Sequence, residues 1–146
     1  MRTRCLWLLV GLVMLAGVPN QLQAQKAVVK IDSISQDKSI EGKVSNLSDP
    51  KNYRVLVYVK TNHWYIHPFA GLGEGRSWAA IKEDGTWRIS TEKRQYPANS
   101  VAALVVDPET ADQAPAETEN LEEITNHAVI IYSTEEMRKN GWYEKL

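Results

Sequence analysis

The sequence has almost no cysteine, because Cys5 is the only one among its 146 residues. A disulfide framework is therefore excluded. The chain also lacks an excess of positive charge, with 17 Lys and Arg against 18 Asp and Glu, so it offers no electrostatic case for binding nucleic acid. It has no Gly-x-Ser-x-Gly elbow to carry a hydrolase nucleophile, and the glycines of 70–76 lack the Gly-Lys-Ser/Thr ending of a phosphate loop.

Long apolar runs are also missing. The longest run, 5–18, is shorter than the roughly 20 residues that a helix needs to span a bilayer. Arg2 and Arg4 precede this run and Ala24 follows it at a suitable cleavage point, which is the arrangement of a secretory signal peptide. We therefore expect 1–24 to be removed and 25–146 to form an exported protein, periplasmic or extracellular, with no stable membrane insertion. Cleavage would leave a domain without cysteine, held together by its core alone.

The remaining chain consists of short runs of β-branched and aromatic residues separated by turn signals. The clearest pair is 53–60 and 63–69, joined by Thr61 and Asn62, and a second hairpin is indicated by Asp84-Gly85. Further strands are expected at 27–34, 39–45, 77–81, 86–90, 100–106 and 127–132, with 100–106 the most buried. This pattern predicts an all-β fold, an immunoglobulin-like antiparallel β-sandwich of about seven strands in one domain.

Two segments do not fit the strand pattern. Residues 107–123 contain seven acidic residues, two prolines and no basic residue, which predicts a mobile, solvated acidic loop, with calcium binding as a less favoured alternative. Ser133 and Glu136 have the spacing of a capping box, so a short helix is expected up to Asn140, ending at Gly141. Residues 133–146 would then form a helical tail.

The turn at Thr61 and Asn62 decides which side chains of the central hairpin share a face. A two-residue turn would pair Tyr58 with Tyr65 and would place Trp64 in the core. A turn longer by one residue would exchange the two faces and place Trp64 outside. We expect the shorter turn.

This register makes the non-core face of the hairpin unusually aromatic. Tyr58 and Tyr65 would lie on it together, flanked by His63 and His67. For Trp78, beside the glycine-rich loop, a core position and a surface position are equally compatible with the sequence. We expect this face to meet either a ligand or the chain's own tail, and we favour the tail slightly. Five residues therefore form the candidate ligand or partner face: Tyr58, Tyr65, His63, His67 and Trp78.

An ordered set of motifs spans residues 31–106: Ile40-x-Gly42-x-Val44, Asn52-Tyr53-x-Val55-x-Val57-Tyr58-Val59, Trp64-Tyr65-x-x-Pro68, Ile81-x-x-Asp84-Gly85-Thr86-Trp87 and Val101-Ala102-Ala103-Leu104-Val105. This set resembles a poorly characterised family of bacterial exported β-sandwich domains. Its members occur alone or appended to carbohydrate-active enzymes, glycoside hydrolases among them. The resemblance implies an extracytoplasmic accessory or surface module, with glycan binding as an analogy, and it supplies no catalytic residues to carry over.

Nothing in the sequence has the spacing of a catalytic or metal centre. His63 and His67 stand four residues apart, which on a strand is about 13 Å and too far to share one metal ion. We expect no metal, no cofactor and no enzymatic activity.

Three functions remain open. The first is a non-catalytic surface module whose partner is a polysaccharide, and the second is a protein–protein interaction or assembly domain that binds an envelope protein. The third and least favoured is a small exported hydrolase.

Overall fold

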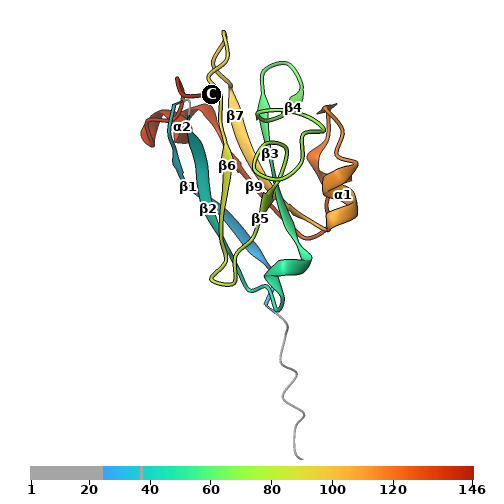
Figure 1. Cartoon of the computed structure of the whole chain (residues 1–146). Coiled ribbons are helices and arrows are strands. Elements are labelled where there is room, and N and C mark those ends of the chain that lie inside the picture. The colour runs from blue at the N-terminus through green and yellow to red at the C-terminus, as the bar shows by residue number, and fades with distance from the viewer. Residues whose placement is uncertain (1–24, 37) are drawn as a thin grey trace, which may run out of the picture.

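The computed structural model describes residues 25–36 and 38–146, so the predicted signal peptide 1–24 lies outside the described residues (Figure 1). Two antiparallel sheets pack face to face. The first contains β1 (Val28–Ile34), β2 (Ser39–Ser45) and β6 (Thr86–Ser90), in that order. The second has the order β8 (Glu117–Thr118), β4 (Trp64–Ile66), β3 (Arg54–Lys60), β7 (Ser100–Val106) and β9 (Ala128–Tyr132), and β5 (Ala79–Ala80) also pairs with β3.

This strand order confirms the predicted β-sandwich. Strands β1, β2 and β6 occupy the places of strands A, B and E of an immunoglobulin domain, and β4, β3, β7 and β9 those of C′, C, F and G. The described residues also form four short helices: η1 (Pro50–Asn52), α1 (Pro108–Asp112), η2 (Leu121–Glu123) and α2 (Thr134–Lys139). No helix among the described residues is long and apolar enough to cross a membrane.

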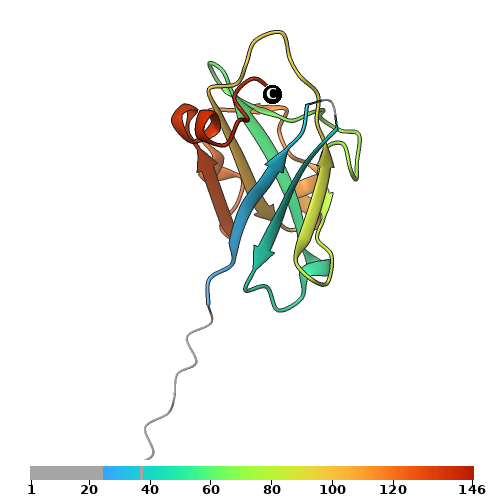
Figure 2. The same cartoon turned by 90° about the vertical axis from the view of Figure 1, so that its left-hand side faces the viewer.

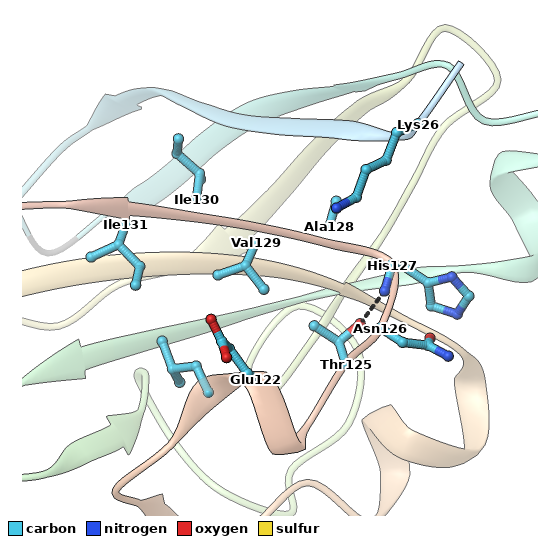
Figure 3. A pocket seen from close by; sticks show the side chains of 10 residues that line it. Lys26, Glu122, Thr125, Asn126, His127, Ala128, Val129, Ile130 and Ile131 are labelled. Atoms are coloured by element: carbon cyan, nitrogen blue, oxygen red, sulfur yellow. Dashed lines mark hydrogen bonds between the residues drawn. The ribbon is translucent and has the colours of Figure 1, made fainter. Parts of the chain in front are cut away.

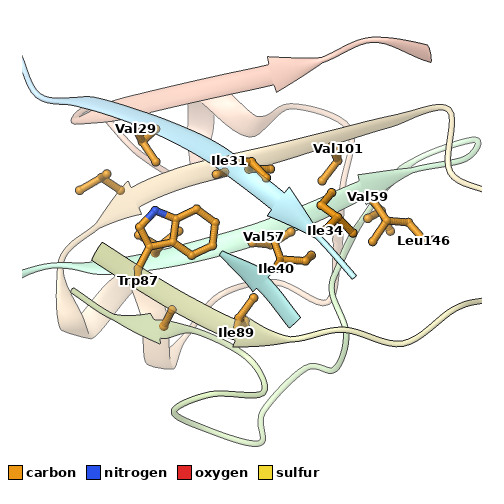
Figure 4. Close-up of a cluster of buried hydrophobic side chains, with 14 of the residues drawn as sticks. Val29, Ile31, Ile34, Ile40, Val57, Val59, Trp87, Ile89, Val101 and Leu146 are labelled. Carbon is orange, nitrogen blue, oxygen red and sulfur yellow. The ribbon is translucent and has the colours of Figure 1, made fainter. Parts of the chain in front are cut away.

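The main core lies between the two sheets (Figure 4). Trp87 of β6 is the largest of its fully buried side chains, and the indole fits because Gly42 of the neighbouring strand has no side chain. A Cβ atom on Gly42 would lie 2.5 Å from the Trp87 ring and 2.0 Å from the carbonyl oxygen of Lys30. The glycine is thus required by close packing between β1, β2 and the indole.

A second core, the outer core, covers the opposite, outer face of the second sheet, on the side where Figure 1 shows α1. Leu56, Tyr58 and Leu104 of the sheet pack there against Ala111 of α1 and Leu121 of η2, all of them buried. The central strands β3 and β7 are therefore covered on both faces. This explains why β3 and β7 are apolar along nearly their whole lengths.

The prediction of a mobile loop at 107–123 is wrong. This segment folds into α1, β8 and η2, which cover the second sheet. Asp107 caps α1 by accepting hydrogen bonds from the backbone N–H and the hydroxyl of Thr110, both at 2.8 Å. Asn120 caps η2 by accepting from the Glu122 N–H at 3.0 Å. The acidic residues face solvent, while the few apolar ones reach the sheet.

The predicted hairpin register is also wrong. Lys60 lies opposite Trp64, and Tyr58 opposite Ile66, because the connection has three residues, with His63 in it as well as Thr61 and Asn62. This one-residue shift moves Trp64 and Ile66 to the outer core. Tyr65 is placed opposite Val59, on the face away from Tyr58.

The helical tail is confirmed as a short helix with a capping box. Ser133 caps α2 by accepting from the Glu136 N–H, and the Glu136 carboxylate accepts from the Ser133 N–H at 2.7 Å. Contrary to our expectation, the tail does not cover the face of Tyr58. Its side chains instead close the inter-sheet core, where Met137, Trp142 and Leu146 are buried.

Candidate functional site

A pocket of about 400 Å³ opens at one end of the inter-sheet core. Val59, Ala98 and Leu146 of that core line its inner part, since all three are buried. Its outer part is formed by the residues that follow β4 and by the 91–99 connection, the loop at the top of Figure 2. This pocket, the loop-end pocket, is mainly apolar with a few polar groups, which is the usual composition of a small-molecule site.

His67 forms a buried wall of the loop-end pocket, with 1 % of its surface exposed. Its Nε2 atom lies 2.7 Å from the Thr91 hydroxyl and 3.4 Å from the backbone nitrogen of Glu92. A backbone N–H can only donate, so Nε2 is the acceptor and the ring proton lies on Nδ1. Burial, together with the positive charge of Arg94, lowers the pKa of His67 to about 3. The imidazole is therefore neutral at ordinary pH.

The His67–Thr91 pair does not form an accessible nucleophile. The Thr91 side chain is itself buried, with 7 % exposure, and it does not line the pocket. A ligand in the pocket would meet the imidazole but not the hydroxyl. We interpret the pair as a hydrogen bond that fixes the ring in the wall.

Aromatic side chains form much of the pocket mouth. Tyr96 is exposed over 71 % of its surface and Tyr65 is half-buried, with its hydroxyl 3.1 Å from the Asn62 side-chain oxygen. Phe69 also lines the pocket, and the guanidinium carbons of Arg76 and Arg94 lie 4.7 and 5.2 Å from its ring centre.

Arg94 links the two segments of the mouth. Its guanidinium donates to the Pro68 carbonyl oxygen and lies 3.4 Å from a carboxylate oxygen of Glu92. The peptide bond between His67 and Pro68 is cis. Arg94 is the charged side chain of the pocket lining, and Thr61 adds a hydroxyl.

The five residues of the predicted ligand face do not form one surface. Tyr65 and His67 meet in the loop-end pocket, and His63 stacks on Tyr65 with ring centres 6.3 Å apart. Tyr58 is completely buried in the outer core, where its hydroxyl donates to the Pro115 carbonyl oxygen at 2.7 Å. Trp78 packs against the same outer core beneath the Arg54 guanidinium, 4.8 Å from its ring centre.

Four further polar, charged or aromatic residues of the pocket were not predicted as site residues from the sequence: Thr61, Phe69, Arg94 and Tyr96. Tyr96 is followed by Pro97 in a polar connection, which is typical of an exposed loop aromatic. Phe69 and Arg94 gave no comparable signal, since their contact depends on the fold.

The acidic segment does not gather ligands for a metal ion. His63 lies near Glu117 and Glu119, at 3.7 and 3.8 Å from the closest carboxylate oxygens. Among the residues that the structure describes, no three His, Cys, Asp or Glu side chains are grouped so as to hold a metal.

Comparison of the chain with protein-family models, curated proteins and solved structures finds no match.

Proposed function

We propose that the protein is an exported, non-catalytic module that binds a saccharide in the loop-end pocket. The observation that carries this proposal is the composition of the pocket mouth. Tyr96 and Tyr65 offer flat apolar faces next to the hydroxyls and the guanidinium of Thr61, Tyr65 and Arg94. A pyranose ring presents the complementary surface, with C–H groups on its faces and hydroxyls around its edge.

The size of the pocket supports a ligand of one or two sugar rings. Its volume of about 400 Å³ is at the lower end of the range for small-molecule sites. Export is supported by the charged and apolar segments of 1–24, and a non-catalytic role by the burial of Thr91 beside His67.

The proposal is tested by titration calorimetry of the purified protein with soluble neutral glucans and mannans and with oligogalacturonate, an acidic saccharide. Binding is expected for at least one of these probes. Tyr96→Ala should weaken it by about tenfold or more, because a stacked aromatic ring contributes more than 1 kcal/mol. An affinity for oligogalacturonate that Arg94→Gln abolishes would identify an acidic sugar.

Gln95→Ala is the matched control, because Gln95 is exposed in the same connection and does not line the pocket. It should leave affinity unchanged. If none of the probes binds, or if Tyr96→Ala and Gln95→Ala bind equally well, the loop-end pocket is not a saccharide site.

A further inference from the structure

The free edge of the second sheet carries an open groove (Figure 3). Strand β9 pairs with β7 on one side, and no strand within 25–36 or 38–146 pairs with its other side. Val129 and Ile131 of this strand are 37 % and 48 % exposed, which is high for apolar side chains in a sheet. An unpaired, apolar edge strand is a template for adding another strand.

The groove has two different walls. It has a volume of about 530 Å³ and extends along β9. Lys26, just before β1, lies on one side of the groove, and Glu122 of η2 lies on the other (Figure 3). The side chains of Val129 and Ile131 point toward η2, since they share the outer face with Leu104 and Ala102 of β7.

The groove continues into an acidic corner. A second hollow of about 300 Å³ shares Glu122, Thr125, Asn126 and His127 with the groove. It adds Asp107 and Glu123 to the lining. Hydrogen bonds from Thr110 lower the pKa of Asp107, so this carboxylate is charged at neutral pH. Residues 107–123 contain no basic residue to offset these charges.

We propose that β9 binds an extended segment of another protein that is both apolar and basic. The segment adds to the free edge of β9 and buries apolar side chains over Val129 and Ile131. Further along the same face, Lys or Arg side chains meet the carboxylates of Asp107, Glu122 and Glu123. Side chains of an added strand alternate between faces, so the basic ones face η2 and not Lys26 on the opposite wall.

This inference is independent of the proposed saccharide site. The β9 groove and the loop-end pocket share no lining residue, and they recognise different chemistry.

A second copy of this chain fits the groove less well. An antiparallel pairing of two β9 strands centred on Ile130 sets Thr125 of one copy opposite Glu135 of the other. The start of α2, with Glu135 and Glu136, would then meet the acidic corner, where like charges repel, while the basic residues Arg138 and Lys139 lie in the last turn of that helix. The strand itself contains no Lys or Arg to offset this repulsion. Charge complementarity therefore favours a basic partner over a homodimer.

The test uses the synthetic peptide Val-Thr-Val-Thr-Lys-Thr-Lys, which places its valines and lysines on one face of a strand. The reversed sequence covers the other strand direction. In titrations of isotope-labelled protein, backbone amide signals of 128–131 should shift and become protected from exchange for one of the two directions. A peptide with Glu in place of both Lys should bind about tenfold more weakly, with a difference that shrinks at high salt.

Variants of the protein locate the binding surface. Ile131→Thr keeps a β-branched side chain but removes apolar surface, so it should weaken binding of the lysine peptide several-fold. Val28→Thr is its matched control, because Val28 is a 54 % exposed residue on the edge strand β1, and it should change nothing. Glu122→Gln with Glu123→Gln should reduce the preference for the lysine peptide over the glutamate peptide, because Asp107 is then the remaining carboxylate of the acidic corner.

Several results would overturn the proposal. Unchanged amide signals of 128–131 at millimolar peptide would show that the edge is closed to strand addition. Equal binding of the lysine and glutamate peptides would show that the groove does not select a basic partner. A concentration-dependent dimer of the protein alone, lost in Ile131→Thr, would show that the groove is filled by a second copy.

Discussion

Lys60 lies directly opposite Trp64 across the β3–β4 hairpin, with its ammonium nitrogen 5.5 Å from the centre of the indole ring. This pairing puts the indole on the outer face of the second sheet, in the core shared with α1 and η2. Val59 and Tyr65 consequently lie on the inner face, where Tyr65 reaches the loop-end pocket. The register of this turn thus decides which aromatic residue lines the loop-end pocket.

Gly42→Ala is expected to destabilise the protein strongly. The new methyl group would meet the carbonyl oxygen of Lys30 and the ring of Trp87 well inside contact distance, so the strands or the indole must move. We expect a loss of about 2–4 kcal/mol in the free energy of unfolding, measured by urea denaturation. Ser45→Ala, at an exposed position of the same strand, should cost much less. Equal losses in the two variants would contradict the packing role of Gly42.

Tyr58→Phe is expected to cost about 0.5–1.5 kcal/mol, because it removes one hydrogen bond and keeps the ring. The Tyr58 hydroxyl donates to the Pro115 carbonyl oxygen and so ties the acidic segment to β3. Burial raises the pKa of Tyr58 well above its ordinary value, so the donor stays protonated. Limited proteolysis should cut 113–120 faster in this variant, and an unchanged cleavage rate would show that the bond does not hold the segment down.

Stability should fall as the pH falls from 6.5 toward 3. Below pH 6.5 the unfolded chain binds a proton at His67, whereas the folded protein excludes it down to about pH 3. The stabilisation is therefore complete above pH 6.5 and is lost through this window, with a slope of up to about 1.4 kcal/mol per pH unit. Urea denaturation at a series of pH values measures it.

His67→Gln should flatten this dependence between pH 6.5 and pH 5, while being less stable than the parent protein at pH 7. His63→Gln is the control, because His63 lies on the surface, and it should keep the slope of the parent. If His67→Gln keeps the full slope, another group takes up the proton.

Met137→Ala should destabilise the protein by about 2–5 kcal/mol, measured by thermal and urea unfolding. Met137 is completely buried, and α2 holds it against the inter-sheet core. Lys139→Ala, at an exposed position of the same helix, should have an effect below about 0.5 kcal/mol. A mild effect of Met137→Ala would show that the tail is only loosely attached.

Local sequence patterns predicted most of the fold, because strand periodicity and turn residues act over short distances. The continuous apolar run of β7 and the capping box of Ser133 are both present as expected. The acidic segment was predicted to be a mobile loop, because most of its residues are polar and face water. Ala111 and Leu121, which attach it to the sheet, are too few to give a periodic signal.

The candidate site was predictable only in part. Tyr65 and His67 were recognised as notable from their types, but their shared pocket follows from a turn of three residues where two were expected. Turn length is a weak signal here, since Thr61 and Asn62 suit either length. Arg94 stands 25 residues beyond Phe69 in the chain, and only the folded structure brings the two side chains together.

The two strands that are covered on both faces, β3 and β7, should be the last part of the molecule to open. Strands β3 and β7 have hydrogen-bonded neighbours on both edges, and side chains cover both of their faces. Their amide protons can reach solvent only when the whole domain unfolds, whereas those on the free edge of β9 need only a local fluctuation. Deuterium uptake should therefore divide the sheet, with β3 and β7 exchanging last and at a rate set by global stability.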